Sequence, residues 1–281
     1  MDGEISCWMA VFDGDCLWGF RARSLNASGA IAAGALGTIV LGLGGVGWAV
    51  VLLSFFISSS ALSRIFRARK ADFNQQFAKG SSRDVGQVLA NGGVAGLFVL
   101  IHFFVYQFDP TSNILPLLWI GFCASFAGAN ADTWATELGV LNPCQPILLR
   151  TLKRVPVGTS GAVSWAGSLA ALAGSALVGG AAVVSRQMGW APVLDFPLWV
   201  VFLVITGAGV VGALIDSWLG ATVQAIFFCE TCNKETERHP LHYCGARTSL
   251  VRGSRWLNND WVNAACTISA ALVGISIILI L

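Results

Sequence analysis

Seven apolar segments, each about as long as a bilayer is thick, constrain this chain more than any other feature. They cover residues 27–45, 46–63, 86–107, 114–134, 160–184, 197–226 and 261–281. A spanning helix needs about 20 mostly apolar residues, and inside hydrocarbon every backbone polar group must be satisfied within the structure. The pattern therefore predicts an all-α integral membrane protein, a polytopic bundle of about seven transmembrane helices.

The composition excludes a water-exposed globule. Of the 281 residues, 55% are hydrophobic and 11% are charged, whereas about 25% of the residues in a soluble domain are charged. We expect a single transmembrane domain over 24–281, with a Cys/His-containing cytoplasmic loop at 229–260. Residues 1–23 contain no apolar run long enough to span, and we expect an interfacial or disordered N-terminal arm there.

The basic residues indicate the orientation. With seven spans, sixteen of the seventeen Lys and Arg residues fall in loops on the side of the N-terminus, and Arg186 alone falls on the other side. Positive residues concentrate in cytoplasmic loops, so the N-terminus is predicted to be cytoplasmic and the C-terminus to lie outside. The membrane is the cytoplasmic one in a bacterium, or a plastid or other organelle membrane in a eukaryote.

Polar side chains within or beside the spans gather toward the predicted cytoplasmic side. They are Asn91, Asp132, Thr133, Glu137, Asp216, Ser217, Gln224, Asn259, Asp260 and Asn263. Ionisable groups at membrane depth are costly and usually functional, and carboxylate oxygens are the ligands that Mg²⁺ prefers. We therefore expect a cavity open to the cytoplasm, with Asp132 and Asp216 as Mg²⁺ ligands and Glu137 as a further catalytic group. The alternative is that each acid pairs with a nearby Arg or lies in interfacial water.

A glycine-rich turn immediately before the fifth segment has the composition of a phosphate site. It comprises Gly158, Thr159, Ser160 and Gly161, and Ser164 follows closely. Backbone amides at the start of a helix attract anions. Cationic side chains bind phosphate strongly, and Arg150, Lys153 and Arg154 lie just upstream, with Lys153 the predicted catalytic cation. This turn is not a Walker A loop, because it lacks the Gly-Lys-Ser/Thr ending of that motif. The alternative to a phosphate site is an ordinary helix cap.

The large polar loop contains a second constellation. Cys229-x-x-Cys232, His242 and Cys244 have the residue types and spacing of a structural zinc site. Four protein ligands leave no open position, so a bound Zn²⁺ would be structural. Three unliganded thiols are the alternative.

Several motifs together resemble one family. They are QVLANGGVA (87–95), ADTWATELG (131–139), VPVGTSGAVSWAG (155–167), DSWLGATVQ (216–224), the CETC and HYCG segments (229–245) and WLNNDWVN (256–263). This set is similar to the transmembrane-protein-nineteen-like family, which includes the phytyl-phosphate kinase of tocopherol biosynthesis and many members without an assigned activity. A weaker similarity links the chain to polyprenol and dolichol kinases and to phosphatidate cytidylyltransferases. Residues 1–20 depart from the family pattern, because they lack the spanning helix expected there.

The resemblance implies a membrane-embedded transferase. Such a kinase would phosphorylate an isoprenyl, phytyl-type monophosphate to the diphosphate with Mg²⁺ and CTP or ATP. Its partners would be the lipid bilayer, the isoprenyl phosphate and the nucleotide, with no nucleic acid. The alternatives are a transporter for an anionic or phosphorylated solute and an assembly factor organised by the Cys/His loop. The nearly uncharged outer half favours the enzyme, while the nucleotide, the prenyl chain and the oligomeric state stay open.

Overall fold

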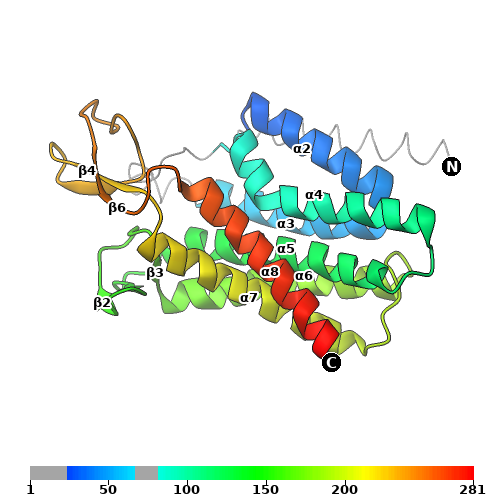
Figure 1. The fold of residues 1–281 in the computed structure, drawn as a ribbon. Coiled ribbons are helices and arrows are strands. Elements are labelled where there is room, and N and C mark those ends of the chain that lie inside the picture. Colours follow the sequence, from blue (N-terminus) through cyan, green and yellow to red (C-terminus); the bar gives the residue numbers. More distant parts are fainter. Residues whose placement is uncertain (1–23, 67–81) are drawn as a thin grey trace.

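A computed structural model describes residues 24–66 and 82–281. The arm expected at residues 1–23 lies outside the described residues. Within them the chain is a bundle of long helices, and two small sheets lie at one end of it (Figure 1).

Seven helical segments of the described chain are long and apolar enough to cross a membrane. They are α2 (Ala27–Ile39) with the π-helical turn η1 (Val40–Gly44), α3 (Val46–Ile65), α4 (Val85–Phe108), α5 (Ile114–Gly139), α6 (Trp165–Gln187), α7 (Leu198–Thr222) and α8 (Asn259–Ile280). The seven-helix integral membrane fold predicted from the sequence is thus confirmed. The orientation toward the cytoplasm stays a prediction.

Helix α5 forms the centre of the bundle. It contacts α3, α4, α6, α7 and α8, and it is the most deeply buried of the seven spans. Small residues allow this close packing: a Cβ on Gly174 of α6 would press against Trp134 of α5, and one on Gly128 of α5 would press against Ala270 of α8. Small residues let helices approach closely in lipid, where apolar surface alone gives little driving force for association.

Four helices begin at the end that carries the sheets, and each has a side-chain cap there. Asn26 accepts from the Gly29 amide at the start of α2, and Asp84 with Gln87 forms a capping box on α4. Ser164 caps α6 and Asn258 caps α8. Such caps satisfy amides that a helix start leaves unpaired. This end of the bundle is therefore rich in ordered polar groups.

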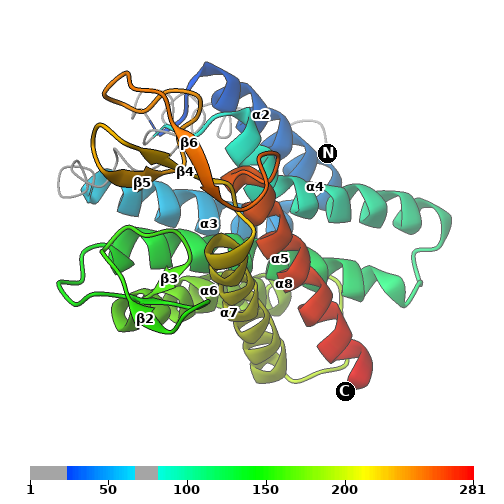
Figure 2. The same ribbon diagram turned by 60° about the vertical axis from the view of Figure 1, so that its left-hand side comes forward.

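Two antiparallel sheets form from the polar loops, and strands there were not expected from the sequence. One has the order β2-β1-β3, and the other has the order β5-β4-β6. Their strands are β1 (Ile147–Leu148), β2 (Lys153–Arg154), β3 (Ala162–Val163), β4 (Ile226–Cys229), β5 (Lys234–Thr236) and β6 (Ser249–Arg252). Both sheets lie beside the same helix ends (Figure 2).

The sheets also explain two of the predicted boundaries that shifted. The sixth apolar segment was expected to run to residue 226, but α7 ends at Thr222. The apolar residues that follow enter β4, where Ile226 and Phe227 are buried. The fifth segment was expected to begin at residue 160, but β3 occupies Ala162–Val163 and α6 begins at Trp165. An apolar run alone does not reveal where a helix gives way to a short buried strand.

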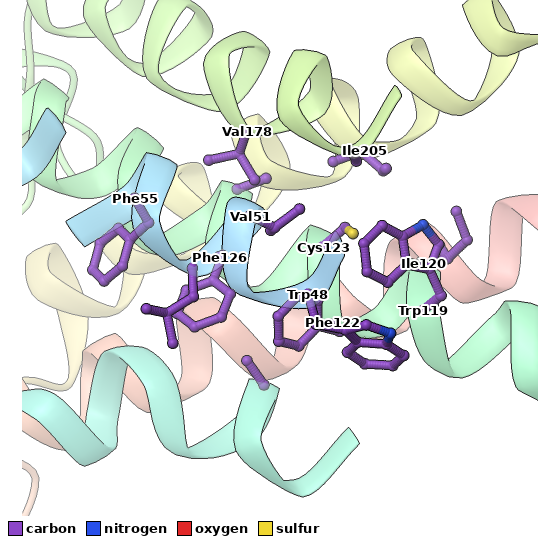
Figure 3. Close-up of a cluster of buried hydrophobic side chains, with 14 of the residues drawn as sticks. Trp48, Val51, Phe55, Trp119, Ile120, Phe122, Cys123, Phe126, Val178 and Ile205 are labelled. Carbon is purple, nitrogen blue, oxygen red and sulfur yellow. The ribbon is translucent and has the colours of Figure 1, made fainter. Parts of the chain in front are cut away.

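An aromatic cluster fills the other half of the bundle (Figure 3). The rings of Trp48 and Phe122 are 4.6 Å apart, and those of Trp48 and Trp119 are 5.0 Å apart. Phe126 packs edge-on against Phe122 at 5.1 Å. Trp119, Phe122 and Phe126 are fully buried. Since all three come from the first half of α5, the interior of that half is closed by packed side chains.

Candidate functional site

A polar cavity of about 350 Å³ lies at the end of the bundle that carries the sheets. Residues of α3 to α8 line it, together with the turn at residues 157–164 and Glu237 from the second sheet region. Most of the residues predicted to form the site line this cavity. They are Asn91, Asp132, Thr133, Glu137, Gly158, Thr159, Ser160, Gly161, Ser164, Asp216, Ser217, Gln224, Asn259, Asp260 and Asn263.

Two carboxyl groups from different spans meet in this cavity. Asp132 of α5 and Asp216 of α7 lie within hydrogen-bonding reach of each other, and the charge of Glu237 acts on both. The Oδ2 atom of Asp216 is buried and has no hydrogen-bond partner among the described residues. Like charges brought together away from water repel strongly unless a proton or a cation compensates them. This pair therefore has the chemistry of a cation site.

Further acids surround the pair. Glu137, Glu237 and Asp260 also line the cavity. Glu137 Oε1 accepts a hydrogen bond of 2.8 Å from Ser63 Oγ, which fixes its carboxylate near the C-terminal end of α3. An acid-lined cavity attracts divalent cations, and a polyphosphate would enter it as a metal complex.

Arg83 is the only Lys or Arg among the described residues that line the cavity. Its backbone is held at both sides: the Arg83 amide donates to Ser24 O at 2.9 Å, and Arg83 O accepts from the Asn26 amide at 3.1 Å. Its guanidinium carbon lies 5.6 Å from the centre of the Phe55 ring. Burial lowers the pKa of Arg83, and the charge of Glu137 opposes this effect. Arg83 is thus a cation with an anchored backbone in the same cavity as the acids.

The glycine turn lines the cavity, but it does not open helix α6. Ser164 caps that helix, and β3 lies between the turn and the cap. The prediction that the amides of this turn form the N-terminus of the helix was therefore wrong, because Ala162 and Val163 pair with β1 instead of joining the helix. Gly161 has a φ of 78°, and a Cβ there would overlap the backbone nitrogen of Ala221. Only glycine meets both demands without strain.

A hydrogen-bonded chain ties this turn to the second sheet. Ser160 Oγ donates to Gln224 Oε1 at 3.0 Å, and Gln224 Nε2 donates to Glu237 Oε1 at 2.8 Å. Gln224 is only 2% exposed. Arg252 of β6 adds a second connection, since its guanidinium donates to Ala221 O at 3.2 Å and to Ser160 O at 3.4 Å. One wall of the cavity thus depends on the sheet for its position.

The structure does not bring the predicted basic triplet to the cavity. Arg150, Lys153 and Arg154 are exposed. Lys153 and Arg154 lie on β2, and β1 separates that strand from β3, which contributes to the cavity wall. The physical reason is the hairpin itself, which folds the triplet outward. The predicted placement of Lys153 at the phosphate site, as its catalytic cation, was therefore wrong.

The cavity lining also includes residues that were absent from the predicted site, among them Ser63, Arg83, Gln87, Glu237 and Asn258. Gln87 and Asn258 lie inside the quoted motifs and could have been included. Arg83 looked like one more positive-inside residue. Nothing in the sequence separated Glu237 from the other charges of its loop.

Several predicted residues use their polar atoms locally. Thr133 Oγ1 donates to Ala129 O at 2.8 Å, and Asn91 Nδ2 donates to Gln87 O at 2.9 Å. Ser164 Oγ accepts from the Gly167 amide. These groups can still accept hydrogen bonds from a ligand, but they also position the helices that form the cavity.

A narrow apolar groove adjoins the cavity. It holds about 50 Å³, and α2, α3 and α4 supply most of its lining, which includes Leu36, Leu52 and Phe56. Arg83, Gln87 and Asn91 line both the groove and the cavity. A ligand with a charged head and an apolar chain could therefore occupy the two spaces at once, with the arginine at their junction.

The Cys/His residues also come together. One ligand atom from each of Cys229, Cys232, His242 and Cys244 lies within 4.8 Å of all the others, and this group could hold a metal ion. Hydrogen bonds from His242 and from the Ala246 amide lower the pKa of Cys244 to about 6. The group lies in the ribbon of β4, β5 and β6, and none of its four residues lines the cavity.

Comparison with known proteins identifies the family. The protein-family model described as integral membrane protein DUF92 matches residues 15–271. The chain belongs to the DUF92 family. Among its relatives, Protein PGR of Arabidopsis thaliana is 34% identical over 252 residues, covering 87% of this chain and 85% of PGR.

More distant DUF92 relatives come from archaea and plastids. The uncharacterized membrane protein MJ0933 of Methanocaldococcus jannaschii is 29% identical over 258 residues, covering 92% of this chain and 87% of its own. The chloroplastic Protein VTE6 of Arabidopsis thaliana is 27% identical over 239 residues, covering 85% of this chain and 61% of VTE6. No solved structure matches the chain.

Proposed function

We propose that this DUF92 protein is a membrane-embedded phosphotransferase that converts an isoprenyl, phytyl-type monophosphate to the diphosphate with a nucleoside triphosphate and Mg²⁺. One observation carries the proposal: two partly buried carboxyl groups from different spans share a cavity that adjoins an apolar groove through Arg83. The family resemblance noted from the sequence implies the same reaction.

The residues of the cavity fit a magnesium ion. Asp132 and Asp216 offer carboxylate oxygens close together, and Asp216 Oδ2 is buried without a partner among the described residues. We assign the metal to these two side chains. When bound, Mg²⁺ would neutralise the negative charge of the nucleotide phosphates.

The groove supports a lipid phosphate as the acceptor. A phosphate held by Arg83 would place its ester chain among Leu36, Leu52 and Phe56, which line the groove. An arginine can bind a phosphate through two parallel hydrogen bonds. A water-soluble acceptor would have no use for such an apolar space beside its charged group.

The reaction needs positioning more than covalent help. An oxygen of the prenyl monophosphate attacks the γ-phosphorus of the nucleotide, and the bond from that phosphorus to the β–γ bridging oxygen breaks. A nucleoside diphosphate leaves with the electron pair, and the attacking oxygen is already anionic. Arg83 would orient the acceptor and stabilise charge on the transferring group, while Glu137 would keep Arg83 in place. Ser160 and Gly161 would shape the wall against which the phosphates lie.

The other half of the bundle argues against a transport pathway. Directly beyond the cavity, the centre of α5 is closed by Phe122 and Phe126, both fully buried. A carrier needs polar groups along its whole route, and this region offers packed rings instead (Figure 3). A site reached from one side suits an enzyme better.

A direct assay tests the proposal. Purified protein in lipid vesicles receives Mg²⁺, CTP or ATP labelled in the γ-phosphate, and prenyl monophosphates of several lengths. We expect the label in a prenyl diphosphate, and we expect Asp132→Asn to abolish its formation. Asp195→Asn, which changes an exposed acid outside the cavity, is the matched control. Label that never enters a lipid product, or equal rates in the two variants, would refute the proposal.

A further inference from the structure

The ribbon formed by β4, β5 and β6 has almost no core of its own. Between Gln224 and Asn258 the buried apolar side chains are Ala225, Ile226, Phe227 and Cys229. All four belong to one short stretch in or beside β4. Such a small unit needs a crosslink or a metal to hold its loops, because it buries too little apolar surface to offset the entropy of ordering them.

The four ligand groups lie close enough together to surround one zinc ion, all within 4.8 Å of one another. Cys229 Sγ lies 3.6 Å from Cys244 Sγ, and His242 Nδ1 lies 3.2 Å from Cys244 Sγ. Zn–S bonds of about 2.3 Å and Zn–N bonds of about 2.0 Å at tetrahedral angles give ligand separations of about 3.5 to 3.8 Å. These two separations agree with the tetrahedral values to within a few tenths of an ångström.

Two of the four ligand residues are each followed by a residue with a positive φ. Cys232 is followed by Asn233 with a φ of 52°, and Cys244 is followed by Gly245 with a φ of 82°. A residue in this left-handed region turns the chain sharply back after the ligand. After Cys244 the turn brings the Ala246 amide into a hydrogen bond with the sulfur. Amide hydrogen bonds to thiolates are a usual support around structural metal sites.

The ribbon also bears on the cavity. Glu237 follows β5 directly, and it accepts the hydrogen bond from Gln224 that continues to Ser160 in the glycine turn. A Cβ on Gly253, just after β6, would overlap the backbone of Gln224, so the ribbon packs tightly against the end of α7. The position of Ser160 therefore depends on the order of the ribbon.

We propose that Cys229, Cys232, His242 and Cys244 bind a structural zinc ion, and that this ion holds Glu237 and Gln224 in place so that the Gly158–Gly161 turn keeps its shape. All four positions of the metal are taken by protein ligands, so it has no catalytic role. The proposal goes beyond the phosphotransferase reaction and stands without it, because neither the ligand set nor the hydrogen-bonded chain involves the substrate.

Metal content is the first test. The full chain is purified without chelators, and its zinc is measured by mass spectrometry beside Cys232→Ser and Cys144→Ser. Cys144 is an exposed free thiol outside the group, which makes it the matched control. We expect about one zinc per chain in the wild type and in Cys144→Ser, and none in Cys232→Ser. A Cys229–Cys244 disulfide in place of metal, or equal zinc in all three proteins, overturns the site.

Hydrogen exchange tests the link to the turn, and it needs no substrate. Zinc is removed from folded wild-type protein with a chelator, which avoids variants that fail to fold. We expect exchange to rise at least about tenfold in residues 226–252 and 158–162, because both would lose their ordering contacts, and to stay unchanged in α5. Glu237→Gln should keep its zinc and loosen only the turn. Exchange that rises in the ribbon alone would overturn the coupling.

Discussion

The two halves of helix α5 differ in the kind of interior that they face. Its first half presents Trp119, Phe122 and Phe126 to an interior that is fully packed. Its second half presents Asp132 and Glu137 to a polar cavity. Only about 9 Å of helix separates Phe126 from Asp132, at 1.5 Å per residue. The packed half supplies the rigidity on which the positions of the acids depend, and the polar half is where we propose the chemistry.

This difference indicates that one half of the bundle stabilises the fold and the other half carries the proposed function. Apolar side chains that interlock in the first half gain dispersion contacts with many neighbours. Adjacent carboxyl groups in the second half repel each other, and they are retained at a cost to stability. Substitutions in the two halves should therefore fail in different assays.

The largest effect is expected at Asp216. Asp216→Asn keeps the shape of the side chain but removes a charge and a metal ligand, and we expect the rate of transfer to fall by about a thousandfold, which is about 4 kcal/mol. Thermal unfolding in detergent should show a midpoint equal to or above that of the wild type, because like-charge repulsion is relieved. A variant that loses activity by unfolding would contradict this separation.

The converse is expected at Phe122. Phe122→Ala leaves a cavity among fully buried rings, and we expect it to cost about 3 kcal/mol of unfolding free energy. Phe104→Ala is the matched control, since Phe104 is 58% exposed and faces outward. Equal losses in the two variants, measured by unfolding in mixed detergent, would show that the aromatic cluster does not stabilise this half.

Substitutions of Arg83 and Lys153 test which cation binds the lipid phosphate. We expect Arg83→Gln to raise the KM for the lipid phosphate by about 10- to 100-fold, because a buried charged hydrogen bond is worth about 1.5–3 kcal/mol. Lys153→Gln on the exposed strand β2 should change it by less than about twofold. Steady-state kinetics over a range of acceptor concentrations compares them, and the reverse order would restore the sequence-based assignment of Lys153.

The smallest effect concerns the apolar groove. Ala33→Leu enlarges a side chain that lines the groove but not the cavity. We expect the KM for a long prenyl monophosphate to rise by about fivefold, about 1 kcal/mol, while a short-chain acceptor is unaffected. Equal changes for both chain lengths would show that the tail lies elsewhere.

The helices could be predicted from the sequence almost to their ends. Apolar length is a direct physical requirement of the bilayer, so each of the seven spans left a plain signal. The strands could not be predicted in the same way. Pairs such as Ile147 with Val163 involve two residues per strand, and so short a run carries no periodicity. The same limitation concealed the end of α7, where an apolar helix passes into the buried strand β4.

The cavity could be predicted in part for a related reason. Acids within spans stand out against apolar neighbours, so Asp132 and Asp216 were identified at once. Arg83 was not, because it lies among other basic residues of a loop that was predicted to be cytoplasmic. Backbone pairing between Arg83 and Leu25, which are far apart in the sequence, distinguishes Arg83 from the other basic residues. No local sequence pattern predicts that contact. Lys153 shows the opposite error, since its nearness in sequence to the glycine turn did not become nearness in space.

The binding of Mn²⁺ tests the central assignment most directly. Spin resonance of Mn²⁺ added to the purified protein with a non-hydrolysable nucleotide reports metal binding without turnover or a lipid substrate. We expect tight binding to the wild type and to Asp195→Asn, and an affinity lower by at least about a hundredfold in Asp132→Asn and Asp216→Asn. Equal affinity in all four proteins would contradict the account, because the acids of the cavity would then not hold the metal.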